Sequence, residues 1–125
     1  MARRTSLFAE LYSAHREEPP AESGWLDDCI RYMELHYTEA INVNQIAQDF
    51  GLNRSYVTTA LTKRIGQSPG QYIQSLRLQK GARLLRETDL SVTEIALTVG
   101  YPDLYSFSRS FANVHGLSPS KYRSL

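Results

Sequence analysis

The amino-acid sequence predicts an all-α fold in which one long helix joins two helix-turn-helix units. Three observations predict it: an internal repeat, matching helix-capping residues in both copies, and a 19-residue segment of helical periodicity between the copies. The chain has 125 residues, of which 42% are hydrophobic and 22% charged. These values are typical of a single globular domain and exclude a disordered or collagen-like chain.

The repeat has an offset of 49 residues that becomes 50 after an internal turn, and its matched positions are apolar or turn-forming. Before that turn the matches are Val43 with Val92, Ile46 with Ile95, Ala47 with Ala96 and Gly51 with Gly100. After it they are Val57 with Phe107, Leu61 with Phe111, Gly66 with Gly116, Ser68 with Ser118, Pro69 with Pro119 and Tyr72 with Tyr122. Two copies are too few for a solenoid and favour a duplicated helical unit.

Residues 1–24 are expected to be a tail and linker, and possibly the end of a missing sensor domain. Residues 7–12 hold a short apolar stripe, and residues 16–24 are rich in Pro, Glu, Ser and Gly. An amphipathic helix follows from Trp25 to Tyr37, with Leu26, Cys29, Ile30, Met33 and Tyr37 on one face. The lone cysteine, Cys29, is expected to be a small core residue, and the lack of a disulfide partner favours a reducing, cytoplasmic setting.

Each repeat copy is predicted to hold a short helix, a glycine turn and a second helix. Asn42 with Gln45, and Ser91 with Glu94, have the spacing of a capping box. Gly51 and Gly100 stand where the short helices end in a left-handed residue. The second helices are expected over 54–65, capped by Asn53, and over 104–114, capped by Asp103.

Ser68 and Pro69 are expected to open the linking helix, which runs to Glu87. Its apolar positions are Ile73, Leu76, Leu84 and Leu85, with Tyr72 and Leu78 alongside. Nineteen residues span roughly 28 Å, close to the ~34 Å between adjacent major grooves on one face of DNA. The second Ser-Pro pair opens a short terminal helix.

Charge is segregated along the chain, although the net charge is only +1. Residues 1–24 carry a net −1, residues 25–52 a net −4 and residues 53–125 a net +6. Such segregation favours a polyanionic partner for the C-terminal part, although an unevenly charged solvated surface would look the same.

Both copies closely resemble the AraC/XylS family of bacterial transcription regulators over residues 25–124. The second copy carries the resemblance in Ser91, Glu94, Ile95, Ala96, Gly100, Tyr101, Asp103, Phe107, Ser108, Arg109, Phe111, Gly116, Ser118, Pro119, Tyr122 and Arg123. The first copy and the linking helix carry it in Ile46, Ala47, Gly51, Ser55, Tyr56, Gly66, Ser68, Pro69, Tyr72, Arg77, Leu78, Leu84 and Leu85. The resemblance implies a seven-helix DNA-binding domain over 25–124, with unit one at about 25–67, the linking helix at 69–87 and unit two at 91–124.

The chain departs from the family pattern in both recognition helices. Thr59, Leu61 and Thr62 stand where the family has Arg, Phe and Lys, and Ala112 and Asn113 where it favours a basic residue. The first recognition helix is therefore less cationic than usual. Gly81 replaces an alanine within the linking helix, at an expected cost of about 1 kcal/mol.

Repeat position and resemblance together imply the DNA contacts. The base-contacting candidates are Arg54, Ser55, Thr58, Thr59, Leu104, Tyr105, Ser108 and Arg109. The phosphate-contacting candidates are Thr62, Lys63, Arg64, Lys121 and Arg123.

For several of these residues the sequence leaves alternatives open. Arg109 can read guanine, grip a phosphate or pair with a carboxylate, and Tyr105 can touch DNA or pack against the domain. Arg77 matches a family position, and an ion pair or a carbonyl contact is expected there rather than a DNA contact.

The predicted function is sequence-specific DNA binding by a transcription regulator, an activator, with its recognition helices in successive major grooves. The partners implied are double-stranded DNA and RNA polymerase, with no cofactor, metal or membrane, and the isolated domain is expected to be monomeric. An effector would bind a sensor domain for which this chain has no segment.

An enzyme is not expected, because His15, His36 and His115 are scattered and form no recognisable catalytic or metal-binding group. The alternative function is a helical protein–protein adaptor with lost or weakened DNA reading.

Overall fold

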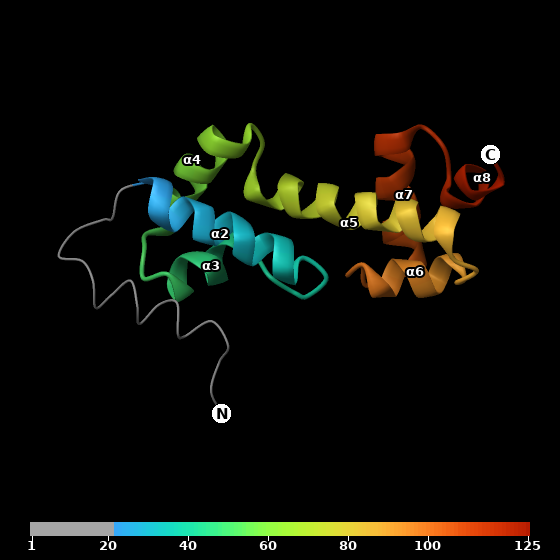
Figure 1. The fold of residues 1–125 in the computed structure, drawn as a ribbon, viewed down its shortest axis with the longest axis horizontal. Coiled ribbons are helices and arrows are strands. Elements are labelled where there is room, and N and C mark those ends of the chain that lie inside the picture. The colour runs from blue at the N-terminus through green and yellow to red at the C-terminus, as the bar shows by residue number, and fades with distance from the viewer. Residues whose placement is uncertain (1–21) are drawn as a thin grey trace, which may run out of the picture. The chain divides into compact units, whose positions relative to one another are not determined.

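The computed structural model describes residues 22–125, which form seven helices and no strand (Figure 1). The helices are α2 (Glu22–His36), α3 (Val43–Asp49), α4 (Arg54–Ile65), α5 (Pro69–Glu87), α6 (Val92–Thr98), α7 (Leu104–His115) and α8 (Pro119–Ser124). The predicted all-α fold is confirmed. The expected apolar stripe of residues 7–12, and all but the last three residues of the expected linker, lie outside the described residues.

The described residues pack as two compact units. The first comprises residues 22–36 and 41–72, and the second comprises residues 37–40 and 73–125. Helix α5 is continuous, and the boundary between the units falls inside it. The short segment 37–40, which lies between α2 and α3 in sequence, belongs to the second unit.

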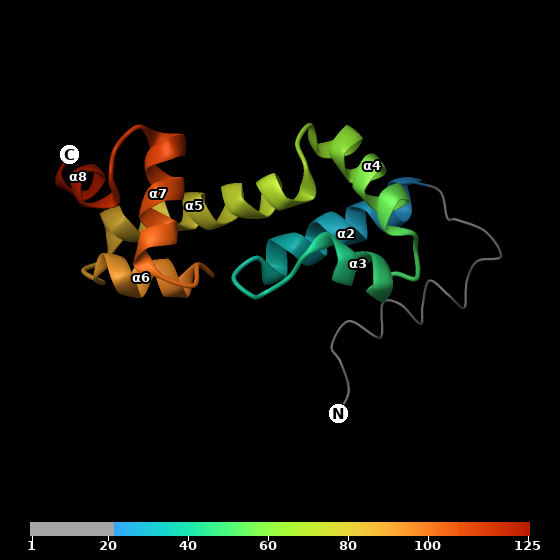
Figure 2. The same ribbon diagram turned by 180° about the vertical axis from the view of Figure 1, so that it is seen from behind.

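The first unit packs α3 and α2 against α4 (Figures 1 and 2). Helix α2 begins three residues before the predicted start at Trp25. Its buried face is also different from the predicted one: Trp25 and Tyr32 are buried beside Leu26, Cys29 and Met33, whereas Ile30 and Tyr37 are only half-buried. The face is centred on Trp25 and Cys29 because the Trp25 ring packs against Tyr56 of α4, with 5.4 Å between ring centroids.

The caps of the first unit explain where its helices begin. The Asn42 side chain accepts a hydrogen bond from the backbone N–H of Gln45 (2.9 Å), and Asn53 accepts one from that of Tyr56 (3.1 Å). The predicted capping box at Asn42 is only half formed. The Gln45 side chain donates instead to Asp49 Oδ1 (3.0 Å), one helical turn further along α3.

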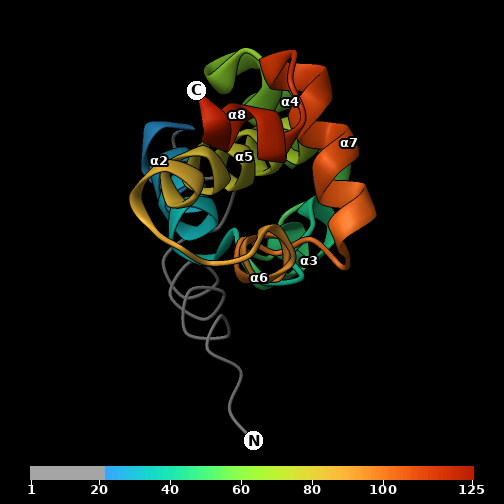
Figure 3. The same ribbon diagram turned by 90° about the vertical axis from the view of Figure 1, so that its right-hand side faces the viewer.

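The second unit repeats the α3–α4 pair with α6 and α7, and α8 packs against α7. Ser91 and Glu94 form the complete predicted capping box, with hydrogen bonds of 3.0 and 2.8 Å. Asp103 caps α7 by accepting from the Ser106 N–H (2.7 Å), and Gly116, at φ +79°, ends the helix in the left-handed conformation. Figure 3, in which α6 is seen nearly end-on and α7 from the side, shows that these two contacting helices are steeply inclined to each other, as expected for a helix-turn-helix pair.

The core of the second unit gathers the inner faces of α5, α6 and α7. Its buried residues are Leu78, Ala82, Leu85, Ile95, Ala96, Val99, Tyr101, Phe107 and Phe111. On α5 the predicted apolar residues Ile73, Leu78 and Leu85 are buried, whereas Leu76 and Leu84 are only half-buried. Ala82, which the sequence pattern did not single out, is also buried. Gly81 lies on this buried face, where the Phe107 ring approaches its backbone closely.

Arg77 of the second unit hydrogen-bonds to two backbone carbonyls. Arg77 donates from Nε to the carbonyl of Tyr37 (2.6 Å) and from Nη2 to that of Glu39 (2.8 Å). The expected carbonyl contact of Arg77 is therefore confirmed. Burial lowers the pKa of Arg77 from its ordinary value, more than the nearby Tyr101 raises it.

Candidate nucleic-acid interface

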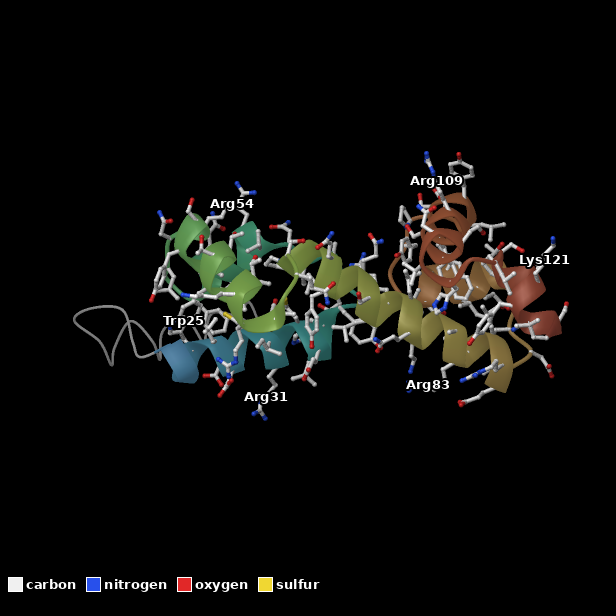
Figure 4. The ribbon with its side chains drawn as sticks, turned by 90° about the horizontal axis from the view of Figure 1, so that it is seen from above. Trp25, Arg31, Arg54, Arg83, Arg109 and Lys121 are labelled. Carbon is white, nitrogen blue, oxygen red and sulfur yellow. The ribbon has the colours of Figure 1, made fainter. Side chains whose placement is uncertain are left out.

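The first helix-turn-helix unit presents one polar face of α4 to solvent. Val57, Ala60 and Leu61 are buried on the opposite face and hold the helix against its neighbours. The four predicted base-contacting residues, Arg54, Ser55, Thr58 and Thr59, together line an open depression of roughly 250 Å³. The four α4 residues that were predicted from the repeat and the resemblance therefore lie on one surface. Figure 4 shows Arg54 extending outward from α4.

The depression on α4 is polar but holds only one cation. Arg54 supplies a guanidinium, and the other three lining residues supply hydroxyl groups and, in the two threonines, methyl groups. Hydroxyls accept and donate hydrogen bonds to several bases, whereas a guanidinium is suited to guanine. This face can therefore follow a groove with weak discrimination between bases.

The second unit presents the corresponding face of α7. Phe107 and Phe111 are fully buried, which leaves Leu104 (40% exposed) and Tyr105 (69% exposed) on the outer face near the start of the helix. Arg109 is exposed one turn further on, and Figure 4 shows its side chain extending outward; Ser108 is half-buried. Tyr105 therefore does not pack against the domain, which was one of the alternatives.

Arg109 stacks on Tyr105. The guanidinium carbon lies 5.3 Å from the centroid of the Tyr105 ring, within cation–π distance. The carboxylate partner that the sequence left open for Arg109 is not present among the described residues. Sequence reasoning named both residues but missed the pair, although the i, i+4 spacing on a helix was a signal for it.

Some of the predicted phosphate-contacting side chains are exposed, and others already bind groups of the protein itself. Thr62, Lys63 and Lys121 are exposed. Arg64 forms an ion pair with Asp27 of α2, and that contact uses the guanidinium. Arg123 also has protein partners: its Nε donates to the carbonyl of Leu85 (2.9 Å) and its Nη2 to that of Thr88 (3.1 Å). Its half-buried guanidinium lies at the end of α5, and a phosphate contact by Arg123 stays a prediction.

The N-termini of the two recognition helices differ in charge. Neither α4 nor α7 has an acidic residue in its first turn. Asn53, the cap of α4, is neutral, whereas Asp103 caps α7 with a carboxylate. Hydrogen bonds from the backbone and side chain of Ser106 hold the pKa of Asp103 below its ordinary value.

Residues 22–125 lack the features of a metal site, a membrane span and a reactive cysteine. No group of three potential metal-ligating side chains occurs there. No helix in this range combines the length and apolar character needed to cross a bilayer. The Cys29 thiol is fully buried, and burial, reinforced by Asp28, raises its pKa to about 12. Its predicted role as a core residue is confirmed, and it has none of the features of a reactive cysteine.

Comparison with known proteins places residues 46–124 in a family described as a helix-turn-helix domain. The HTH-type transcriptional activator RhaS of Escherichia fergusonii is 34% identical over 128 residues, which covers 98% of this chain and 46% of that protein. The chain spans less than half the length of the curated relatives that lead this comparison.

Solved structures share the fold. The DNA-binding domain of AdpA, determined in complex with a target DNA, has a TM-score of 0.76 and 25% identity, with 79% of this chain and 89% of that chain covered. A transcriptional regulator with an AraC-type DNA-binding domain from Chromobacterium violaceum has a TM-score of 0.72 and 26% identity, with 79% and 88% covered. Both comparisons extend over the two helix-turn-helix units.

Proposed function

Because the chain belongs to the AraC/XylS family of bacterial transcription regulators, a family of non-enzymatic DNA-binding proteins, we propose that it is the DNA-binding part of a sequence-specific transcription activator. Helices α4 and α7 are its recognition helices and enter successive major grooves. The observation that supports this proposal most directly is that each helix buries one face in a repeated helix-turn-helix unit and exposes an arginine on the other face, Arg54 on α4 and Arg109 on α7. RNA polymerase is the expected partner for activation, the bacterial cytoplasm the expected location, and any effector would bind elsewhere in a longer protein.

The two faces supply different chemistry to the duplex. On α7, Arg109 has in-plane N–H donors for the O6 and N7 of guanine, and Leu104 offers an apolar surface to thymine methyl groups. On α4, Arg54 and the hydroxyls of Ser55, Thr58 and Thr59 contact bases less selectively. Thr62, Lys63 and Lys121 contact phosphates, which position the protein without reading sequence.

Selection of duplexes from random-sequence DNA by the 125-residue chain tests this proposal directly. We expect an enriched sequence whose affinity falls as salt rises, since phosphate contacts release counterions. Arg109→Ala should cost about 1–3 kcal/mol on the enriched duplex and relax one base position. Lys121→Ala is the matched control, and its loss should be equal on all sequences. An Arg109→Ala loss that is equally uniform would assign that residue to phosphate.

The second candidate function is a helical adaptor that binds protein rather than DNA. It is favoured by the lining of the depression on α4, in which Arg54 is the one charged residue. Failure to bind any selected or promoter duplex at low salt would support the adaptor and reject the DNA-binding proposal.

A further inference from the structure

We propose that Tyr105 is a positioning residue that fixes the guanidinium of Arg109 for the reading of one guanine. This inference rests on the proposed function and assigns the base specificity of the second unit to a pair of side chains instead of to one arginine. The pair is Tyr105 and Arg109, one turn apart on the exposed face of α7, with 5.3 Å between the guanidinium carbon and the ring centroid.

The pair stands on a rigid part of the helix. Tyr105 is the second residue of α7, two residues after the Asp103 cap, whose carboxylate interacts with the backbone N–H groups of Tyr105 and Ser106. Two residues beyond Tyr105, Phe107 is fully buried and anchors the same turn in the core. The ring thus projects from a fixed backbone although 69% of its surface is exposed.

In the other arginine–tyrosine contacts of the described residues, the tyrosine ring packs against the core of the second unit. Arg77 lies 5.9 Å from the ring centroid of Tyr101, a buried residue, and its guanidinium also binds two backbone carbonyls. Arg86 lies 6.0 Å from that of Tyr122, whose ring packs on Phe111. Only the Tyr105–Arg109 contact lies on a recognition face, so it adds nothing to core packing.

The contact with Tyr105 does not use the hydrogen-bond donors of the arginine. The guanidinium carbon lies over the Tyr105 ring, and a cation–π contact depends on the charge of the guanidinium and not on its N–H groups. Guanine presents O6 and N7 as two acceptors at one edge, and a bidentate contact requires both donors to be correctly oriented. A stacked guanidinium loses less rotational freedom on binding than an unsupported arginine, because part of that order already exists in the free protein.

The test combines base substitution with a double-mutant cycle on the duplex that the wild-type chain selects. The variants are Tyr105→Leu, Tyr105→Phe, Arg109→Ala and the Tyr105→Leu/Arg109→Ala double variant, each checked for helix content by circular dichroism. We expect Tyr105→Leu to weaken binding about fivefold and to reduce the preference for guanine at the Arg109-dependent position by the same factor. Tyr105→Phe keeps the ring and should stay within about twofold of wild type.

In the Arg109→Ala background, Tyr105→Leu should cause no further loss, because its effect acts through Arg109. Additive losses would overturn the inference and assign Tyr105 a DNA contact of its own. A Tyr105→Phe loss as large as that of Tyr105→Leu would also overturn it, since the hydroxyl and not the ring would then be responsible. These results leave the proposed function standing, whereas a wild-type chain that selects no sequence overturns both.

Discussion

At the scale of single residues, Gly81 shows how a packing contact reverses an expectation from propensity. In an exposed helix, glycine is less favourable than alanine, and the family pattern has alanine at this position. In the structure a Cβ at Gly81 would lie 2.8 Å from Cε1 and 2.9 Å from Cζ of Phe107. The Phe107 ring is fully buried in the core of the second unit. Glycine here is a requirement of core packing that the sequence could not reveal.

Gly81→Ala should therefore lower the free energy of unfolding by about 1 kcal/mol, since the cost of overpacking exceeds the gain in helix propensity. Gly70→Ala on the same helix is the matched control. No atom lies within 4 Å of a Cβ at Gly70, and that variant should gain about 0.5–1 kcal/mol. Urea denaturation of both variants gives the comparison. Equal stabilisation of the two would show that the Phe107 contact does not constrain position 81.

Arg77 is a second residue whose importance depends on its surroundings. Arg77→Ala leaves the carbonyls of Tyr37 and Glu39 without their charged donor, and we expect the free energy of unfolding to fall by about 2 kcal/mol. Arg83→Ala, which removes an exposed arginine from the same helix, should change it by less than about 0.5 kcal/mol. Thermal or urea denaturation measures both. An Arg77→Ala variant as stable as Arg83→Ala would contradict a structural role for the two carbonyl bonds.

At the scale of elements, the sequence predicted the helices well because their ends carry local chemistry. The N-cap side chains, the left-handed glycines and the Ser-Pro openings act within a few residues, so their patterns are readable in sequence. The capping box at Asn42 is the exception, and its reason is equally local. Gln45 has an alternative acceptor in Asp49 and uses it, whereas Glu94, as an acceptor, satisfies the Ser91 N–H.

The cap of α7 makes the stability of that helix depend on pH. The pKa of Asp103 is lowered in the folded protein, so the stabilisation is present above the unfolded pKa and is lost as pH falls through the folded pKa. Unfolding measured between about pH 5 and pH 2 should show this decline. Asp103→Asn keeps a capping side chain without an ionisable group, and its profile should lack this contribution. Superimposable profiles for the two proteins would exclude Asp103 as its source.

At the scale of the whole molecule, the sequence predicted which side chains of the candidate site are exposed wherever exposure follows the helical period of the apolar residues. The base-contacting candidates fell on the exposed or half-buried faces of α4 and α7 because the matched positions of the repeat mark the buried faces. The cationic candidates were less predictable. Whether an arginine reaches solvent or a carbonyl depends on residues far away in sequence, as Leu85 and Thr88 are from Arg123.

One chain that carries two readers should recognise an asymmetric site. We expect footprinting to show two protected major-groove segments about 10 base pairs apart, with no palindromic relation between them. Protection of only one segment per chain would contradict the two-reader proposal.

The placement of residues 37–40 in the second unit has a consequence for how the protein can be divided. The chain enters the second unit after α2, returns to form α3 and α4, and enters it again along α5. No single cut therefore separates the two units with all their residues. A fragment ending within α5 would lack the Arg77 guanidinium that holds the carbonyls of Tyr37 and Glu39. A fragment beginning there would lack the carbonyls. Although the protein is built from a repeated motif, its halves are interleaved and cannot be exchanged as contiguous modules.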